Sequence, residues 1–101
     1  MVVENLKVSI LIAVFNGEAT LIDSIKSITS QTYKNLEILI IDDGSDDKTY
    51  EICKSLEKED KRIRIYKNQD NIGLTKSLNI LLEKSSGCLL YTSDAADEED
   101  S

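Results

Sequence analysis

The sequence predicts an α/β fold with an open, mostly parallel sheet and flanking helices. Two runs of Ile, Leu and Val are apolar on both alternating faces, as strands covered by helices on both sides are. Apolar residues at helical spacing follow each predicted strand, and the 101-residue chain contains no proline. Strands that alternate with helices in this way form parallel sheets with right-handed crossovers. The length allows one domain of this kind.

The first predicted strand is Val8–Val14, which is rich in β-branched residues. Asn16 and Gly17 interrupt the strand pattern. The helical repeat that follows predicts a helix packed back on the sheet. Its expected inner face consists of Leu21, Ile22, Ile25 and Ile28.

The second predicted strand is Leu36–Ile41, and Asp42-Asp43-Gly44-Ser45 closes it with a tight turn. We expect Ser45 or Asp46 to cap the next helix, because short polar side chains accept hydrogen bonds from free N–H groups at helix starts. The inner face of that helix is marked by Tyr50, Cys53 and Leu56.

The third predicted strand, Arg62–Tyr66, alternates polar and apolar residues, which is typical of a strand nearer a sheet edge. We therefore expect the first strand to be the central one of three within residues 6–87. A third helix is predicted to begin near Gly73 and to end at Gly87 in a left-handed cap. Leu89–Tyr91 can start a fourth strand. The apolar stripe of the third helix comprises Leu74, Leu78, Leu81 and Leu82.

Composition excludes several classes of function. Twelve basic and 19 acidic residues give a formal charge of −7, which argues against nucleic acid or an anionic membrane surface as the main partner. The absence of histidine excludes His-based triads and His-ligated zinc. Two cysteines and no signal segment indicate a reducing cytoplasm. No apolar run approaches the roughly 20 residues that a membrane helix needs.

Candidate ligand-binding residues follow the predicted strands, because ligands of such sheets bind beyond the carboxyl ends of the strands. Asp42 and Asp43 can accept hydrogen bonds from the N–H of a base or from a ribose hydroxyl. Phe15 and Asn16 add an aromatic face and an amide at the same edge. The alternatives are a turn-capping role for Asp43 and core packing for Phe15. The segments concerned are Ala13–Glu18, Asp42–Ser45 and Asn68–Gly73.

Four motifs, in this order, resemble the amino-terminal half of family 2 glycosyltransferases. They are Val8–Glu18, Ser30–Ile38, Ile41–Asp47 and Asn71–Asn79. The resemblance covers residues 6–87 and implies a truncated, Rossmann-like GT-A fold that binds a nucleotide sugar. It also implies hexosyl transfer that inverts the anomeric carbon.

The resemblance implies roles for residues at the carboxyl ends of the strands. Ala13, Phe15 and Asp43 would line the nucleobase pocket, and Asp42 would support that loop. The family commonly has proline where Ala13 stands, and alanine accepts the same extended conformation with less rigidity. The other expected nucleotide-binding residues are Asn16 and Glu18, in the loop after the first strand, and Asn71 and Gly73, nearer the ribose and phosphate.

The resemblance also implies a cation site that this chain lacks in part. An Asp-x-Asp motif would fall on Asp94-Ala95-Ala96, so Ala96 stands where the second carboxylate is needed. Mn²⁺ and Mg²⁺ require oxygen ligands. We therefore expect a divalent cation in the full-length family member and none held by this chain, in which Asp94 is the one remaining candidate. The general base and the acceptor site are expected in the missing carboxyl-terminal half, so we assign no catalytic residue here.

Residues 88–98 resemble the in-frame translation of a transposase adapter used in sequencing-library preparation. We therefore divide the chain into an amino-terminal nucleotide-sugar-binding part, residues 1–87, and a non-native or disordered tail, residues 88–101. The alternative is a divergent fourth strand with an acidic end.

The predicted function is the donor-binding half of a family 2-like glycosyltransferase of polysaccharide biosynthesis, inactive as this chain alone. Its partners would be a nucleotide-diphospho-sugar, UDP-linked, and a glycan or lipid-linked acceptor. The full-length protein would act in the cytoplasm, or at the cytoplasmic face of the membrane. Two alternatives remain: a non-catalytic Rossmann-like nucleotide-binding or interaction module, and a phosphoacceptor receiver domain. The receiver domain is disfavoured because Asp42 and Asp43 follow the second strand rather than the first.

Overall fold

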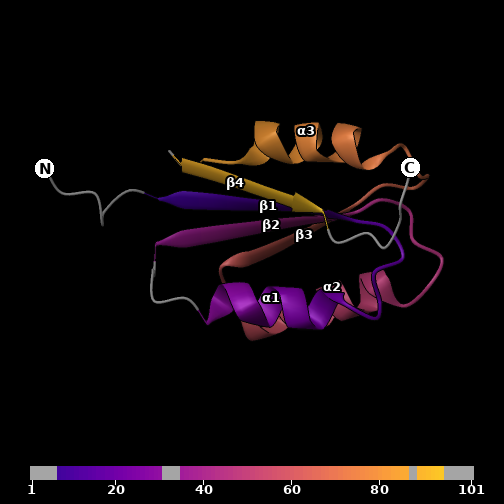
Figure 1. Ribbon diagram of the computed structural model, residues 1–101, viewed down its shortest axis with the longest axis horizontal. Coiled ribbons are helices and arrows are strands. Elements are labelled where there is room, and N and C mark those ends of the chain that lie inside the picture. The colour runs from indigo at the N-terminus through magenta and orange to yellow at the C-terminus, as the bar shows by residue number, and fades with distance from the viewer. Residues whose placement is uncertain (1–6, 31–34, 87–88, 95–101) are drawn as a thin grey trace, which may run out of the picture.

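Four parallel strands form one sheet in the order β3-β2-β1-β4 (Figure 1). The computed structural model describes residues 7–30, 35–86 and 89–94. Helices α1 and α2 cover one face of the sheet and α3 covers the other (Figure 1). The strands are β1 Val8–Val14, β2 Leu36–Asp42, β3 Ile63–Lys67 and β4 Leu89–Asp94. The helices are α1 Leu21–Thr29, α2 Thr49–Glu59 and α3 Leu74–Lys84. The predicted open α/β sheet with flanking helices is confirmed.

The place of β1 in the sheet differs from the expectation. Among the three strands within residues 6–87, β2 lies in the middle, and β1 becomes an interior strand because β4 pairs along its other side. Apolar residues on both faces of β1 indicate that helices cover both faces of the sheet. They do not predict which strands lie beside β1. The edge position of β3 is confirmed, and Ile63 is its only buried residue.

Strand alternation divides the buried side chains into two cores. The larger core lies between the sheet and α1 and α2, and the smaller one lies under α3. Buried residues of the larger core are Ile10, Ile12, Val14, Leu21, Ile25, Leu36, Ile38, Ile40, Cys53, Leu56 and Ile63. Those of the smaller core are Leu11, Ala13, Leu39, Ile41 and Leu81.

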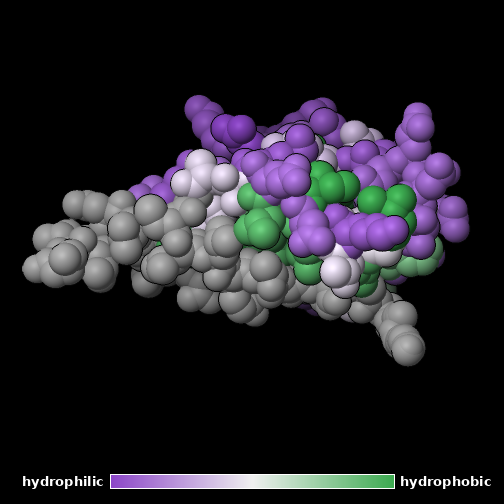
Figure 2. Space-filling model, turned by 90° about the horizontal axis from the view of Figure 1, so that it is seen from above, coloured by the Kyte–Doolittle hydropathy of each residue, from purple (hydrophilic) through white to green (hydrophobic). Residues whose placement is uncertain are grey.

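Two predicted core residues lie at the surface. Ile22 is 40% exposed and Leu82 is 46% exposed, because each sits at the margin of its helical stripe. On α3 the buried Ser77 lies on the inner face. Seen from the α3 side, apolar side chains reach the surface among hydrophilic ones (Figure 2).

Two predicted helix ends are wrong. Helix α2 has Lys48 as its N-cap residue, and neither Ser45 nor Asp46 caps it. The Ser45 hydroxyl instead accepts a hydrogen bond from the Asn16 N–H. Helix α3 ends at Lys84 with an extended Ser85 as its C-cap, before Gly87, which lies outside the described residues.

A buried carboxylate joins three segments near the amino-terminal end of the sheet. Glu37 of β2 accepts hydrogen bonds from the Ser9 hydroxyl at 2.7 Å and the Ser86 N–H at 2.7 Å. Lys7 Nζ lies 3.3 Å from Glu37 Oε1. Burial raises the pKa of Glu37, but these hydrogen bonds and the lysine charge outweigh it and lower the pKa to about 2. The contacts tie the end of α3 to β1 and β2.

Candidate functional site

Three loops meet at the carboxyl ends of β1, β2 and β3. The strand ladder continues into them, since the Asp43 N–H donates to the Val14 carbonyl at 2.8 Å and the Asn68 N–H donates to the Asp42 carbonyl at 2.9 Å. This is the edge at which parallel sheets bind ligands. The loops are residues 15–20, 43–48 and 68–73.

Asp43 is the organising residue of this edge. Its carboxylate is fully buried. Oδ1 accepts hydrogen bonds from Asn68 Nδ2 and the Ile72 N–H, both at 2.9 Å. Oδ2 accepts hydrogen bonds from Asn71 Nδ2 at 3.0 Å and the Gly73 N–H at 2.9 Å. One side chain therefore holds the whole 68–73 loop against the end of β2.

Gly44 allows the 68–73 loop to approach this closely. A Cβ at Gly44 would lie 2.8 Å from the backbone nitrogen of Asn71 and 2.9 Å from the carbonyl carbon of Asp70. Gly44 also has a φ of +75°, which side-chain-bearing residues rarely adopt. The glycine that the sequence places after the two aspartates is thus required by close packing as well as by the turn.

Asp42 and Asp43 point to opposite faces of the sheet and do not form a carboxylate pair. Asp42 Oδ1 accepts a hydrogen bond from the Ser45 N–H at 3.0 Å, which closes the turn. Asp42 lies on the α1 and α2 side, near Cys53. Burial, together with the Asp42 and Glu57 charges, raises the pKa of the Cys53 thiol to about 12, so Cys53 packs in the core and is not a nucleophile.

Asn16 joins the loop after β1 to the loop after β2 through a reciprocal pair of hydrogen bonds. Its N–H donates to the Ser45 hydroxyl, and its Oδ1 accepts the Asp46 N–H, both at 2.8 Å. Asn16 has a φ of 52°, a left-handed conformation that asparagine tolerates better than most residues. The Asn16 amide oxygen is therefore engaged within the protein.

Glu18 extends the same contact between the two loops. Its N–H donates to Asp47 Oδ2 at 3.2 Å, and its Oε1 accepts the Lys48 N–H at 3.2 Å. The Gly17 N–H donates to the buried Thr49 hydroxyl at 2.9 Å, and that hydroxyl donates to Asp47 Oδ1. Burial raises the pKa of Asp47, but the Thr49 and Glu18 hydrogen bonds outweigh it and lower the pKa below its usual value.

The structure brings some of the predicted site residues together and separates others. Phe15 follows Val14, which is in register with Asp42, so Phe15 and Asp43 leave neighbouring strands side by side. Phe15 is half-buried, whereas Ala13 is fully buried in the smaller core. Asn71 and Gly73 contact Asp43, while Asn16 and Glu18 contact the loop after β2.

Sequence reasoning placed Asn68 in a candidate loop without a role of its own, and it missed Asp47 and Thr49 as organising residues. The signal for Asn68 was an amide directly after the third strand. The signal for Asp47 and Thr49 was their spacing, a carboxylate two residues before the threonine at which α2 begins. At this spacing the aspartate side chain can accept a hydrogen bond from the threonine N–H.

The described residues do not fit a divalent cation. No three His, Cys, Asp or Glu side chains lie together there in a way that could hold a metal ion. Asp94 ends β4 in register with Ala13, and Ala96 lies outside the described ranges. No helix in the described part of the chain has the length and apolar character needed to cross a membrane.

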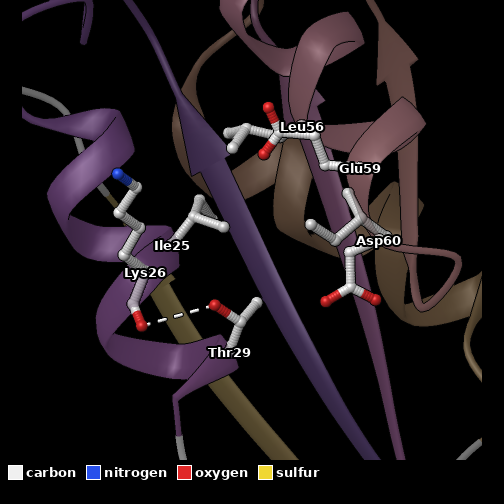
Figure 3. A pocket seen from close by; sticks show the side chains of 7 residues that line it. Ile25, Lys26, Thr29, Leu56, Glu59 and Asp60 are labelled. Atoms are coloured by element: carbon white, nitrogen blue, oxygen red, sulfur yellow. Dashed lines mark hydrogen bonds between the residues drawn. The ribbon is translucent and has the colours of Figure 1, made fainter.

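A pocket between α1 and α2 lies away from this edge (Figure 3). It opens where β3 begins, at the amino-terminal end of the sheet. Figure 3 shows that one of its polar groups, the Thr29 hydroxyl, is bonded to the Lys26 carbonyl of the same helix. The pocket is lined by Ile25, Lys26, Thr29, Leu56, Glu59, Asp60 and Ile63. Its position does not suit a ligand of a parallel sheet.

Sequence comparison links the chain to a family. Residues 9–100 match the sequence model described as glycosyl transferase family 2. An uncharacterized glycosyltransferase of Haemophilus influenzae is 44% identical over 90 residues. That match covers 89% of this chain and 28% of the relative, so the chain spans less than a third of the relative's length.

Two solved structures share the fold. A mannosyltransferase from Pyrobaculum calidifontis in complex with GDP-Man and Mn²⁺ has a TM-score of 0.83 at 19% identity, covering 89% of this chain and 27% of that one. S. aureus TarS 1-349 in complex with UDP has a TM-score of 0.82 at 22% identity, with the same two coverages. The expected Rossmann-like GT-A fold is confirmed by these likenesses.

Proposed function

This chain belongs to glycosyl transferase family 2, and we propose that it is the donor-binding part of an enzyme that transfers a sugar from a UDP-linked sugar. The observation that carries the proposal is the pairing of Phe15 with Asp43 at adjacent strand ends. A nucleobase can stack on the ring and donate its N–H to the carboxylate. Structures of the same fold in complex with UDP and with GDP-Man support a nucleotide ligand.

The finer features of the reaction are part of the same proposal. The transfer inverts the anomeric carbon, and the acceptor is a glycan or a lipid-linked sugar. The reaction takes place in the cytoplasm or at the cytoplasmic face of the membrane. Mn²⁺ or Mg²⁺ would be held by carboxylates of a longer chain, since the described residues do not fit a cation. This chain alone is expected to transfer no sugar. Mn²⁺-dependent release of UDP from a UDP-sugar by the purified 101-residue chain would contradict that expectation.

A titration with UDP tests the nucleotide site. Chemical-shift changes are expected to centre on Phe15 and on residues 42–44, and Asp43→Asn should weaken UDP binding about tenfold or more, because the loss of a charged acceptor costs about 1.5–3 kcal/mol. Asp23→Ala, which removes an exposed carboxylate on α1, is the matched control and should bind UDP as the unmodified chain does. Shifts confined to Lys58–Arg64 would show nonspecific phosphate attraction and contradict the proposal.

A further inference from the structure

We infer that the Asn71 side-chain amide occupies the acceptor position that the nucleobase needs on Asp43, so that Asn71 is an internal competitor of the donor nucleotide. The inference rests on the proposed function. The family resemblance implies that Asn71 contacts the nucleotide. In this inference Asn71 instead lowers nucleotide affinity.

The burial of Asp43 requires such an exchange. A carboxylate has about four lone-pair positions, and four N–H donors already occupy those of Asp43. The side chain has no exposed surface. A base N–H can therefore bond to this carboxylate only where one of the present donors leaves.

Among the four donors, the Asn71 amide is the one whose departure costs least. The Ile72 and Gly73 N–H groups belong to the backbone at the start of α3. The Asn68 amide is half-buried and is also within 3.0 Å of the Ser77 hydroxyl. Asn71 is exposed, and its amide bonds only to the carboxylate and carbonyl oxygens of Asp43 among the described residues. Once released, it can hydrogen-bond to water.

The exchange conserves the number of hydrogen bonds to the Asp43 carboxylate. The ring N–H of the base replaces the Asn71 amide at Oδ2, while the two backbone donors keep the loop in place. Binding therefore requires that both hydrogen bonds of the Asn71 amide break, the charge-assisted one to the Asp43 carboxylate and the one at 3.2 Å to the Asp43 carbonyl. Removal of the competing amide should tighten binding.

Asn71→Ala tests the inference by UDP titration. UDP binding should become about tenfold tighter or more, because a hydrogen bond to a charged group contributes about 1.5–3 kcal/mol. Gln69→Ala is the matched control, because Gln69 is an exposed amide of the same loop and makes no hydrogen bond among the described residues. Its affinity should equal that of the unmodified chain.

A second measurement needs no variant. In the unmodified chain, saturation with UDP should move the Asn71 side-chain amide resonances to those of a solvent-exposed amide, while hydrogen exchange at the Ile72 and Gly73 N–H stays slow. Unchanged or weaker binding by Asn71→Ala, or an Asn71 amide that stays bonded in saturating UDP, would overturn the inference and leave the proposed function standing. Absence of UDP binding to both proteins would overturn the two together.

Discussion

Glu37, near the start of β2, and Asp43, directly after its end, are both buried carboxylates, and their hydrogen-bond partners differ in kind. Glu37, at the amino-terminal end, is bonded to two serines and paired with the Lys7 cation. Asp43, just after the carboxyl end, is hydrogen-bonded only to neutral amides within the part of the chain that the structure describes. A carboxylate with a cation beside it is compensated in charge, whereas one held by neutral amides has no compensating cation, so a ligand donor can take the place of one of the amides. Glu37 therefore serves to join segments, and Asp43 is suited to exchange a partner for a ligand.

Asp43→Ala should have the largest effect on stability. The substitution leaves the amides of the 68–73 loop without their common acceptor, and each unsatisfied donor costs about 1–3 kcal/mol where water cannot replace it. We expect the free energy of unfolding to fall by about 3 kcal/mol or more, as measured by urea denaturation. A loss of less than about 1 kcal/mol would show that the loop does not depend on this carboxylate.

Glu37 should make stability depend on pH in the acid range. Its pKa is lowered from 4.5 to about 2 in the folded chain, so its stabilisation is complete above the unfolded pKa and is lost as the pH falls through the folded one. We expect a loss of about 2–3 kcal/mol between pH 5 and pH 2. Denaturation of Glu37→Gln over this range should show a correspondingly flatter pH dependence. Equal slopes for the two proteins would contradict this account of Glu37.

Lys7→Ala should have the smallest effect. It removes the cation from Glu37 and leaves the serine hydrogen bonds, so Glu37 comes to resemble Asp43. The Lys7 side chain is 40% exposed, and such pairs contribute about 0–1 kcal/mol. The Glu37 pKa, followed by NMR titration, should rise in this variant, because Lys7 lowers it both as a hydrogen-bond donor and as a charge. A Glu37 pKa that stays unchanged in Lys7→Ala would contradict a role for the lysine at this end of the sheet.

Periodicity and turn residues alone predicted the three helices, the strands and the loops that carry the candidate site. These features follow from local rules: two-sided apolar runs, helical spacing and a glycine after the second strand. The exposure of Ile22 and Leu82 could not be predicted in this way, because helical spacing shows which side of a helix is apolar but not how far the neighbouring helix or sheet covers it. The position of β1 in the sheet could not be predicted from its own residues either, because it depends on the pairing of β1 with β4.

The sequence by itself determined that Phe15, Asp43 and the 68–73 loop lie at one edge, since the carboxyl ends of parallel strands meet there. Only the tertiary structure decided what each side chain does at that edge. Asn16 and Glu18 bind the loop after β2, and Asn71 binds Asp43, through contacts that span 25 or more residues of sequence. A hydrogen bond between distant residues depends on how the chain packs, and neither composition nor local spacing specifies which donor reaches which acceptor.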